Sequence, residues 1–233
     1  MIRATAPTPL PALVFDLDGT LVDSAPDIGV AVNRLLREEG HPALDPAVVI
    51  SFVGDGATQL VQRAFAVSGP APEGVVLDTL LVRFMAHYHA APAVLTKPYD
   101  GVAPVLTQLK QAGHKLGVCT NKPDALIEAV LKGTGLARYF DAAVGPDKVS
   151  RRKPDPAHLR ATLDAMGVAS GAPAIMIGDS INDVRAAQGV GLPCVCVTYG
   201  YIQGRIEDWG ADALIDRFTD LPEALRQLTG SVS

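Results

Sequence analysis

The chain has 233 residues, of which 48% are hydrophobic and 19% are charged, and its formal net charge is −5. This composition is typical of a globular protein, and the length allows one large domain or two small ones. The mild acidic balance argues against nucleic-acid or membrane binding, so attraction of an anionic substrate would need a local cation.

The first predicted element is a short apolar strand over residues 12–15, which ends abruptly in Asp16. Residues 25–92 then indicate one helix after another, with breaks near Gly40 and Gly69. This segment is too long for an ordinary strand-to-helix loop. We therefore predict a helical cap domain over 25–92, inserted into a core domain formed by 1–24 and 93–233.

Strands and helices alternate after the predicted cap. A helix with apolar positions from Val102 to Leu109 precedes a strand over 115–119, and further strands are predicted over 174–177 and 194–197. This alternation predicts an α/β fold, a doubly wound Rossmann-like parallel sheet.

The cysteines and the absence of targeting signals favour a cytoplasmic protein. Cys119, Cys194 and Cys196 all lie in apolar, strand-like runs, so we expect reduced core residues. The first eleven residues lack the apolar run of a signal peptide, and no apolar stretch is long enough to span a membrane.

Polar residues follow three of the predicted strands. The clusters run from Asp16 to Thr20, from Thr120 to Lys122, and from Gly178 to Asp183, and Lys153 lies in a loop on the same side. Ligands bind outside the carboxyl ends of parallel strands, so we expect these clusters to meet. Each cluster alone also fits an ordinary turn, a solvated loop or a helix cap, but their joint occurrence favours a site.

Four carboxylates in one pocket repel each other unless a cation lies between them. An all-oxygen ligand set favours Mg²⁺. A carboxylate, Mg²⁺, a lysine and a hydroxyl together suit phosphoryl transfer, because a carboxylate can attack phosphorus while the cations neutralise its oxygens. The carboxylates concerned are Asp16, Asp18, Asp179 and Asp183.

From Leu13 to about Leu228 the chain resembles the haloacid dehalogenase superfamily of phosphatases. The resemblance implies a Rossmann-like core with a helical cap, Asp16 as nucleophile and Asp18 as general acid and base. It implies that Thr120 and the Asn121 backbone bind the phosphoryl group and that Lys153 stabilises its charge. The implied Mg²⁺ ligands are the Asp16 carboxylate, the Asp18 carbonyl and Asp179, with Asp183 acting through water.

Within this superfamily the chain is most similar to phosphoglycolate phosphatases, which implies 2-phosphoglycolate as the small-molecule substrate. Asp55 departs from the pattern, since a neutral Asn is common there and a charge would disfavour a substrate carboxylate. The runs that carry the likeness are FDLDGTLVDS, VGDGA, PYDGV, TNKP, RKPDP and GDSIND. Sugar phosphates, a phosphorylated amino sugar, pyrophosphate and a phosphomutase reaction stay open.

The predicted cap offers further candidates for substrate binding. Gly54, Asp55 and Gly56 lie between two helices, where backbone N–H groups could bind an anion or simply form a turn. Arg63 is the candidate for a substrate carboxylate, with an ordinary surface role as the alternative. No histidine is assigned to catalysis, and the oligomeric state is not predicted.

Rival classes are less consistent with the sequence. No lysine lies within 25–92, which disfavours phosphonate hydrolases that form a Schiff base in the cap, and Asp18 disfavours dehalogenases. A phospho-aspartate receiver domain has similar acidic residues but should lack the insertion. A non-catalytic binding protein of this fold stays open.

Overall fold

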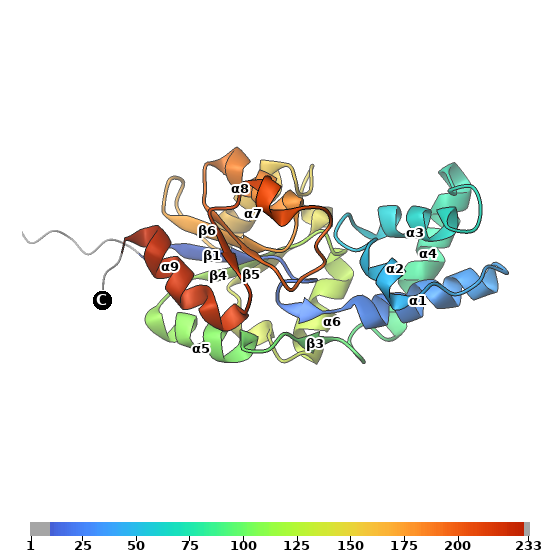
Figure 1. Ribbon diagram of the computed structural model, residues 1–233, viewed down its shortest axis with the longest axis horizontal. Coiled ribbons are helices and arrows are strands. Elements are labelled where there is room, and N and C mark those ends of the chain that lie inside the picture. The colour runs from blue at the N-terminus through green and yellow to red at the C-terminus, as the bar shows by residue number, and fades with distance from the viewer. Residues whose placement is uncertain (1–9, 231–233) are drawn as a thin grey trace, which may run out of the picture.

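The computed structural model describes residues 10–230, and Figure 1 shows a sheet-based core on one side and a helical cap on the other. The core sheet has the strand order β5-β4-β1-β6-β7-β8, and all its neighbouring strands are parallel. This confirms the predicted doubly wound α/β fold. The strands are β1 (Ala12–Phe15), β4 (Leu116–Cys119), β5 (Ala142–Val144), β6 (Ala174–Gly178), β7 (Cys194–Val197) and β8 (Ala213–Ile215).

The central strand β1 is buried along its whole length. Leu13 and Phe15 pack into the apolar cluster on one face of the sheet, and Ala12 and Val14 pack into the cluster on the other face. Strands buried on both faces form continuous apolar runs. This explains why ALVF, LGVC, AIMI and CVCV could be predicted as strands.

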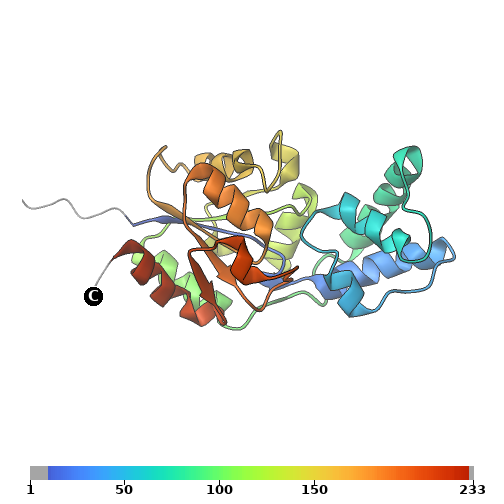
Figure 2. The same ribbon diagram turned by 45° about the horizontal axis from the view of Figure 1, so that its top comes forward.

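Helices cover both faces of the sheet, as the turned view in Figure 2 shows. One face carries α5 (Val102–Ala112), α6 (Asp124–Gly133) and α9 (Leu221–Thr229). The other carries α7 (Pro156–Ala165) and α8 (Ile181–Val190). Short 3-10 helices are η1 (Ala137–Tyr139), η2 (Pro146–Lys148), η3 (Ile206–Trp209) and η4 (Phe218–Asp220).

The sheet reverses its winding direction between β1 and β6. From β1 the chain proceeds to β4 and β5 on one side, and it then crosses to β6, β7 and β8 on the other side. The loops after β1 and β6 therefore diverge, and a crevice opens at the carboxyl ends of these strands. Asp16 follows β1 and Asp179 follows β6, so the topology brings them to this crevice.

Four helices form the cap: α1 (Ala25–Glu38), α2 (Pro46–Ile50), α3 (Ala57–Ala66) and α4 (Gly74–Ala90). They share an apolar cluster that includes Leu35, Leu60 and Phe84. Within residues 10–230, the core contributes only Leu126 and Tyr201 to this cluster. The separate cap cluster supports the predicted insertion, although the boundaries at 25 and 92 stay a prediction.

The chain enters and leaves the cap through a short antiparallel pair, β2 (Val22–Asp23) and β3 (Lys97–Pro98). Sequence patterns did not indicate this pair, because two-residue strands have no periodicity. The same applies to the three-residue strands β5 and β8. Among the described residues, no helix combines the length and apolar character that crossing a membrane requires.

Candidate active site

Asp16 lies at the tip of β1 and is buried, with 7% of its surface exposed. Its backbone N–H donates to the Ile177 carbonyl at 2.9 Å, which extends the strand pairing to this residue. The N–H of Leu17 donates to Asp16 Oδ1 at 2.7 Å, and Lys153 Nζ lies 3.0 Å from the same oxygen. Asp16 Oδ2 makes no hydrogen bond within residues 10–230, so this oxygen is available to a ligand.

Asp16, Asp179 and Asp183 form a buried cluster in which one oxygen from each residue lies within 4.8 Å of the others. Thr20 Oγ1 and the Tyr201 N–H donate to Asp179, at 3.0 and 2.7 Å. The cluster contains only carboxylate oxygens, which is the donor set that Mg²⁺ prefers.

The electrostatics of this cluster fit a divalent cation. Burial raises the pKa of Asp16 from 3.8 to about 7; Lys153 opposes the shift and Asp183 adds to it. Burial, with the nearby charges of Asp16 and Asp183, also raises the pKa of Asp179 well above its ordinary value. A cation among these oxygens would remove the repulsion and favour the ionised forms.

Glycines allow the chain to approach the carboxylates closely. A Cβ atom at Gly19, where φ is +86°, would lie 2.1 Å from Asp179 Oδ2. A Cβ at Gly178 would lie 2.3 Å from the Asp183 carboxyl carbon, and one at Gly200 would lie 2.3 Å from Asp179 Cβ. Any side chain at these positions would displace a carboxylate, so the glycines preserve the shape of the carboxylate cluster.

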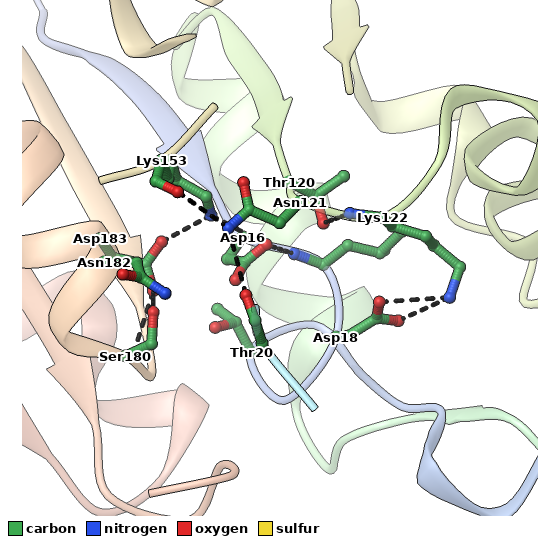
Figure 3. Close-up of polar contacts among 12 residues, drawn as sticks. Asp16, Asp18, Thr20, Thr120, Asn121, Lys122, Lys153, Ser180, Asn182 and Asp183 are labelled. Carbon is green, nitrogen blue, oxygen red and sulfur yellow. Dashed lines mark hydrogen bonds and ion pairs between the residues drawn. The ribbon is translucent and has the colours of Figure 1, made fainter. Parts of the chain in front are cut away.

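Lys153 joins Asp16 to Asp183, as Figure 3 shows. Its Nζ lies 2.6 Å from Asp183 Oδ1 and 3.0 Å from Asp16 Oδ1, and its side chain is 1% exposed. Burial opposes its charge, but Asp16 and Asp183 outweigh this and raise the pKa of Lys153 above its ordinary value. The lysine is therefore positively charged between the carboxylates of Asp16 and Asp183.

His158 holds the backbone of Lys153. Its Nδ1 accepts from the Lys153 N–H at 3.2 Å, and its Nε2 lies 3.1 Å from the Val144 carbonyl. Burial, with a smaller effect of Lys153, lowers the pKa of His158 to about 4, so the ring is neutral at pH 7. Its position in the sequence does not reveal this role, because Val144 is 14 residues away.

Thr120 and Asn121 follow β4 and are both buried. The Lys122 N–H donates to Thr120 Oγ1 at 3.2 Å, so Thr120 is oriented by its own loop. Asn121 Nδ2 donates to the carbonyls of Gly54 and Lys153, both at 3.1 Å. Asn121 thus connects the cap loop, the lysine loop and the tip of β4.

Asp18 does not belong to the carboxylate cluster and points toward Lys122 (Figure 3). Lys122 Nζ lies 3.0 and 3.2 Å from the two carboxylate oxygens of Asp18, and it also donates to Tyr88 Oη. Burial opposes the charge of Lys122, but Asp18 and Tyr88 outweigh it and raise its pKa. The two acids of the D-x-D motif therefore occupy different environments.

A cavity lies between the core and the cap, with Asp16, Asp18 and Thr120 on its core side. The space open to the centres of water-sized molecules is about 50 Å³, enough for several waters or a small ligand. The cap wall is mostly apolar and includes Ile28, Val53, Ala57, Leu60, Phe84 and Tyr88.

The predicted cap loop reaches this cavity. Gly54 and Gly56 line it, and both have positive φ, +115° and +84°. Asp55 accepts from Asn182 Nδ2 at 2.9 Å and pairs with Arg63 at 2.6 Å. Arg63 therefore neutralises the unexpected charge of Asp55, and its direct contact with a substrate stays a prediction.

Sequence reasoning did not single out Lys122, Tyr88, His158 or Tyr201 as functional. Tyr201 Oη accepts from the N–H groups of Ser24 and Ala25 at 2.8 and 2.9 Å and donates to Asp23 at 2.8 Å. Its partners lie about 177 residues away in the chain. Of the four, only Lys122 could have been found, since it belongs to the T-N-K run.

The chain is similar to known proteins over most of its length. The family described as Haloacid dehalogenase-like hydrolase matches residues 13–197. A phosphoglycolate phosphatase of Cereibacter sphaeroides is 41% identical over 94% of this chain and 99% of its own length. One of Rhodospirillum rubrum is 44% identical over 92% of this chain and 90% of its own length.

A solved structure shares the same architecture. The crystal structure of a predicted phosphoglycolate phosphatase from Haemophilus somnus matches with a TM-score of 0.85 and 29% identity, covering 92% of this chain and 97% of the other. Together with the family match and the relatives at about 40% identity, this establishes the kind of enzyme. The chain belongs to the haloacid dehalogenase-like hydrolase family, as one of its phosphatases.

Proposed function

We propose that the protein hydrolyses a small phosphate monoester, with 2-phosphoglycolate as the favoured substrate, through a phosphorylated Asp16. The observation that carries this proposal is the position of Asp16. It lies in a cluster of three buried carboxylates, in contact with Lys153 and at the edge of a small cavity. The relatives in Cereibacter sphaeroides and Rhodospirillum rubrum are both named phosphoglycolate phosphatase, which favours 2-phosphoglycolate among the small esters.

In the first step, Asp16 Oδ2 attacks phosphorus and the bond from phosphorus to the ester oxygen breaks. Asp18 donates a proton to that leaving oxygen, so an alcohol departs and an aspartyl-phosphate remains. In the second step, a water attacks the phosphorus of this intermediate. Asp18 takes the proton of the water, the bond to Asp16 breaks, and inorganic phosphate is released.

The neighbouring residues orient and stabilise the phosphoryl group. Lys153 supplies a positive charge beside Asp16, and Thr120 and the Asn121 backbone supply hydrogen bonds at the tip of β4. Asp16, Asp179 and Asp183, with the Asp18 carbonyl, would hold Mg²⁺, which when bound neutralises phosphoryl oxygens. The glycines around Asp179 and Asp183 keep these ligands in place.

The cap closes the site and limits the size of the substrate. Gly54 and Gly56 belong to the cap wall, and Asp55 between them contacts Asn182 of the core and Arg63 of the cap. A cavity of this volume favours an ester of two or three carbons over a sugar phosphate.

A substrate panel tests the proposal. We expect the protein with Mg²⁺ to hydrolyse both an aryl phosphate and 2-phosphoglycolate over many turnovers, with the higher kcat/KM for 2-phosphoglycolate. A higher kcat/KM for a sugar phosphate or pyrophosphate would reassign the substrate but leave the phosphatase chemistry. A single turnover followed by a stable phosphoprotein would instead indicate a receiver-like protein.

A further inference from the structure

Lys122 is the one basic side chain lining the cavity among the described residues. It is buried, and its Nζ faces the carboxylate of Asp18 at 3.0 Å. Its position differs from that of Lys153, which contacts Asp16 and Asp183. The site therefore has two cations at separate places, one on the side of the nucleophile and one on the side of Asp18.

Tyr88 completes the environment of Lys122 from the cap. This residue belongs to α4, is 3% exposed and lines the same cavity. Its Oη accepts a hydrogen bond from Lys122, and no acceptor for its own hydrogen is present within residues 10–230. A buried O–H without an acceptor is costly, so a ligand that accepts this hydrogen would be favoured.

The position of Asp18 fixes the direction of the leaving group. To protonate the ester oxygen, Asp18 must lie within hydrogen-bond distance of it. In 2-phosphoglycolate the carboxylate carbon is two bonds from that oxygen, so the carboxylate oxygens lie roughly 3 Å from it by standard bond lengths. Lys122 Nζ lies 3.0 Å from Asp18 Oδ1. An ester oxygen that Asp18 protonates would therefore bring the carboxylate of the leaving group close to Lys122.

We propose that Lys122 and Tyr88 form the subsite for the carboxylate of the leaving group, with Lys122 supplying charge and Tyr88 a hydrogen bond. This inference rests on the proposed function and names the residues that select an acidic ester. It differs from the expectation for Arg63, whose guanidinium is paired with Asp55. Because Tyr88 comes from the cap, the subsite is complete only when α4 lies against the core.

The test compares 2-phosphoglycolate with its neutral amide, 2-phosphoglycolamide, which has the same shape without the charge. For Lys122→Met we expect the ratio of the two kcat/KM values, acid over amide, to fall by about 10–100-fold. For Tyr88→Phe we expect a fall of about 3–10-fold. Lys122→Arg keeps the charge and should retain most of the ratio.

The ratio separates recognition from positioning of Asp18. If Lys122 acted only by orienting Asp18, Lys122→Met would slow both esters by the same factor and leave the ratio unchanged, which would overturn the proposal. Lys132→Met is the matched control, since Lys132 is exposed on α6 and pairs with Glu128 away from the cavity. It should change neither rate.

Three further outcomes are informative. If Lys122→Met does not fold, Tyr88→Phe decides, because it removes a single oxygen, and an unchanged ratio in that variant rejects the subsite. If the unaltered protein hydrolyses aryl phosphates but does not prefer the acid over the amide, the subsite is wrong and the phosphatase function stands. Absence of turnover on every ester would reject the proposed function itself.

Discussion

At the scale of single residues, the arrangement of the carboxylates explains the chemistry. Two acids two positions apart, Asp16 and Asp18, lie in contact with different lysines. The Leu17 N–H and Lys153 both contact Oδ1 of Asp16. They orient the carboxylate and leave its other oxygen, Oδ2, to attack phosphorus in the proposed reaction. Asp18 lies toward the cap, where a leaving group would depart. The D-x-D spacing thus gives the proposed nucleophile and the proposed acid separate surroundings.

Replacing Asp16 with Asn should abolish turnover without unfolding the protein. The amide cannot attack phosphorus, so we expect kcat to fall at least ~10³-fold. The fold should persist, because burial already disfavours the charge of Asp16 and Lys153 keeps its contact with Asp183. Kinetics with an aryl phosphate and circular dichroism measure both effects. Activity above a few per cent of the original would contradict the assignment of the nucleophile.

Three residues of the candidate site could be predicted from the sequence because each follows a continuous apolar run. Asp16, Thr120 and Asp179 could be placed on one edge of the sheet from the strand pattern alone, and the structure brings them together. Lys122 and Tyr88 could not be paired in this way, since their contact joins the core to the cap across 34 residues. Contacts of that kind depend on how the cap rests on the core.

At the scale of elements, Tyr201 joins three parts of the molecule. Its N–H donates to Asp179, its Oη accepts from the first residues of α1, and its ring packs in the cap cluster. Asp179 and the entrance to the cap are thus linked through one residue, by its backbone N–H on one side and its hydroxyl on the other.

Tyr201→Phe should destabilise the protein and loosen the cap. Loss of Oη leaves the buried N–H groups of Ser24 and Ala25 without their acceptor, which costs about 1–3 kcal/mol in the free energy of unfolding. Urea denaturation measures this value, and amide hydrogen exchange at Ser24 should become faster. Tyr139→Phe, far from the cap, is the control. Unchanged exchange at Ser24 would refute the role of Tyr201.

Arg63 tests how α3 and the cap loop act together. Because Arg63 is paired with Asp55, we expect Arg63→Ala to raise KM by about 2–10-fold for both 2-phosphoglycolate and an aryl phosphate. Removing the Arg63 guanidinium would weaken substrate binding by releasing Asp55, which lies in the Gly54–Gly56 loop. Steady-state kinetics with both esters provide the comparison. A rise confined to 2-phosphoglycolate would instead put the guanidinium on the substrate carboxylate.

At the scale of the whole molecule, stability should depend on pH through the buried carboxylates. Without metal, the pKa of Asp16 is raised from 3.8 to about 7, so between these values the folded state holds a proton that the unfolded chain releases. Stability from this residue therefore falls as pH rises through that range. His158 has the opposite effect, since burial lowers its pKa to about 4.

The difference between the original protein and Asp16→Asn isolates this contribution. In EDTA, the free energy of unfolding of the original protein relative to the variant should fall by a few kcal/mol, on the order of 2–4, between about pH 4 and pH 8. Urea titrations at a series of pH values measure it. Parallel pH profiles for the two proteins would show that Asp16 does not titrate in this range.

Removal of the metal should stop catalysis and lower the thermal midpoint. We expect EDTA to silence the enzyme and Mg²⁺ to restore it, with about 2.7 kcal/mol of added stability at a hundred times the dissociation constant. Asp179→Asn should lose the Mg²⁺-dependent shift, because Asp179 belongs to the cluster of three. Differential scanning calorimetry gives the shift, and full activity in the chelator would remove the metal from the proposal.

The central strands and the helical cap could be predicted from the sequence, but the outer strands of the sheet could not. The alternation of strands and helices predicted the parallel sheet. The succession of helices over 25–92, with no strand between them, predicted the cap. The strands β5 and β8 were missed because AAV and ALI are too short to distinguish from loop residues. How the cap rests on the core depends on single side chains from distant segments, such as Tyr88 and Tyr201, and no local pattern encodes that.

The two chain segments that join core and cap run side by side, with Val22 paired to Pro98 and Asp23 to Lys97. Asp27 of α1 accepts from the N–H groups of Leu95 and Thr96, so the crossings are also fastened together on the cap side. The covalent connections between core and cap are thus confined to this one pair of crossings. Sequence changes within the cap can therefore alter which molecules reach the strand tips while the strand tips themselves stay the same. Selectivity and reactivity can then diverge independently during evolution.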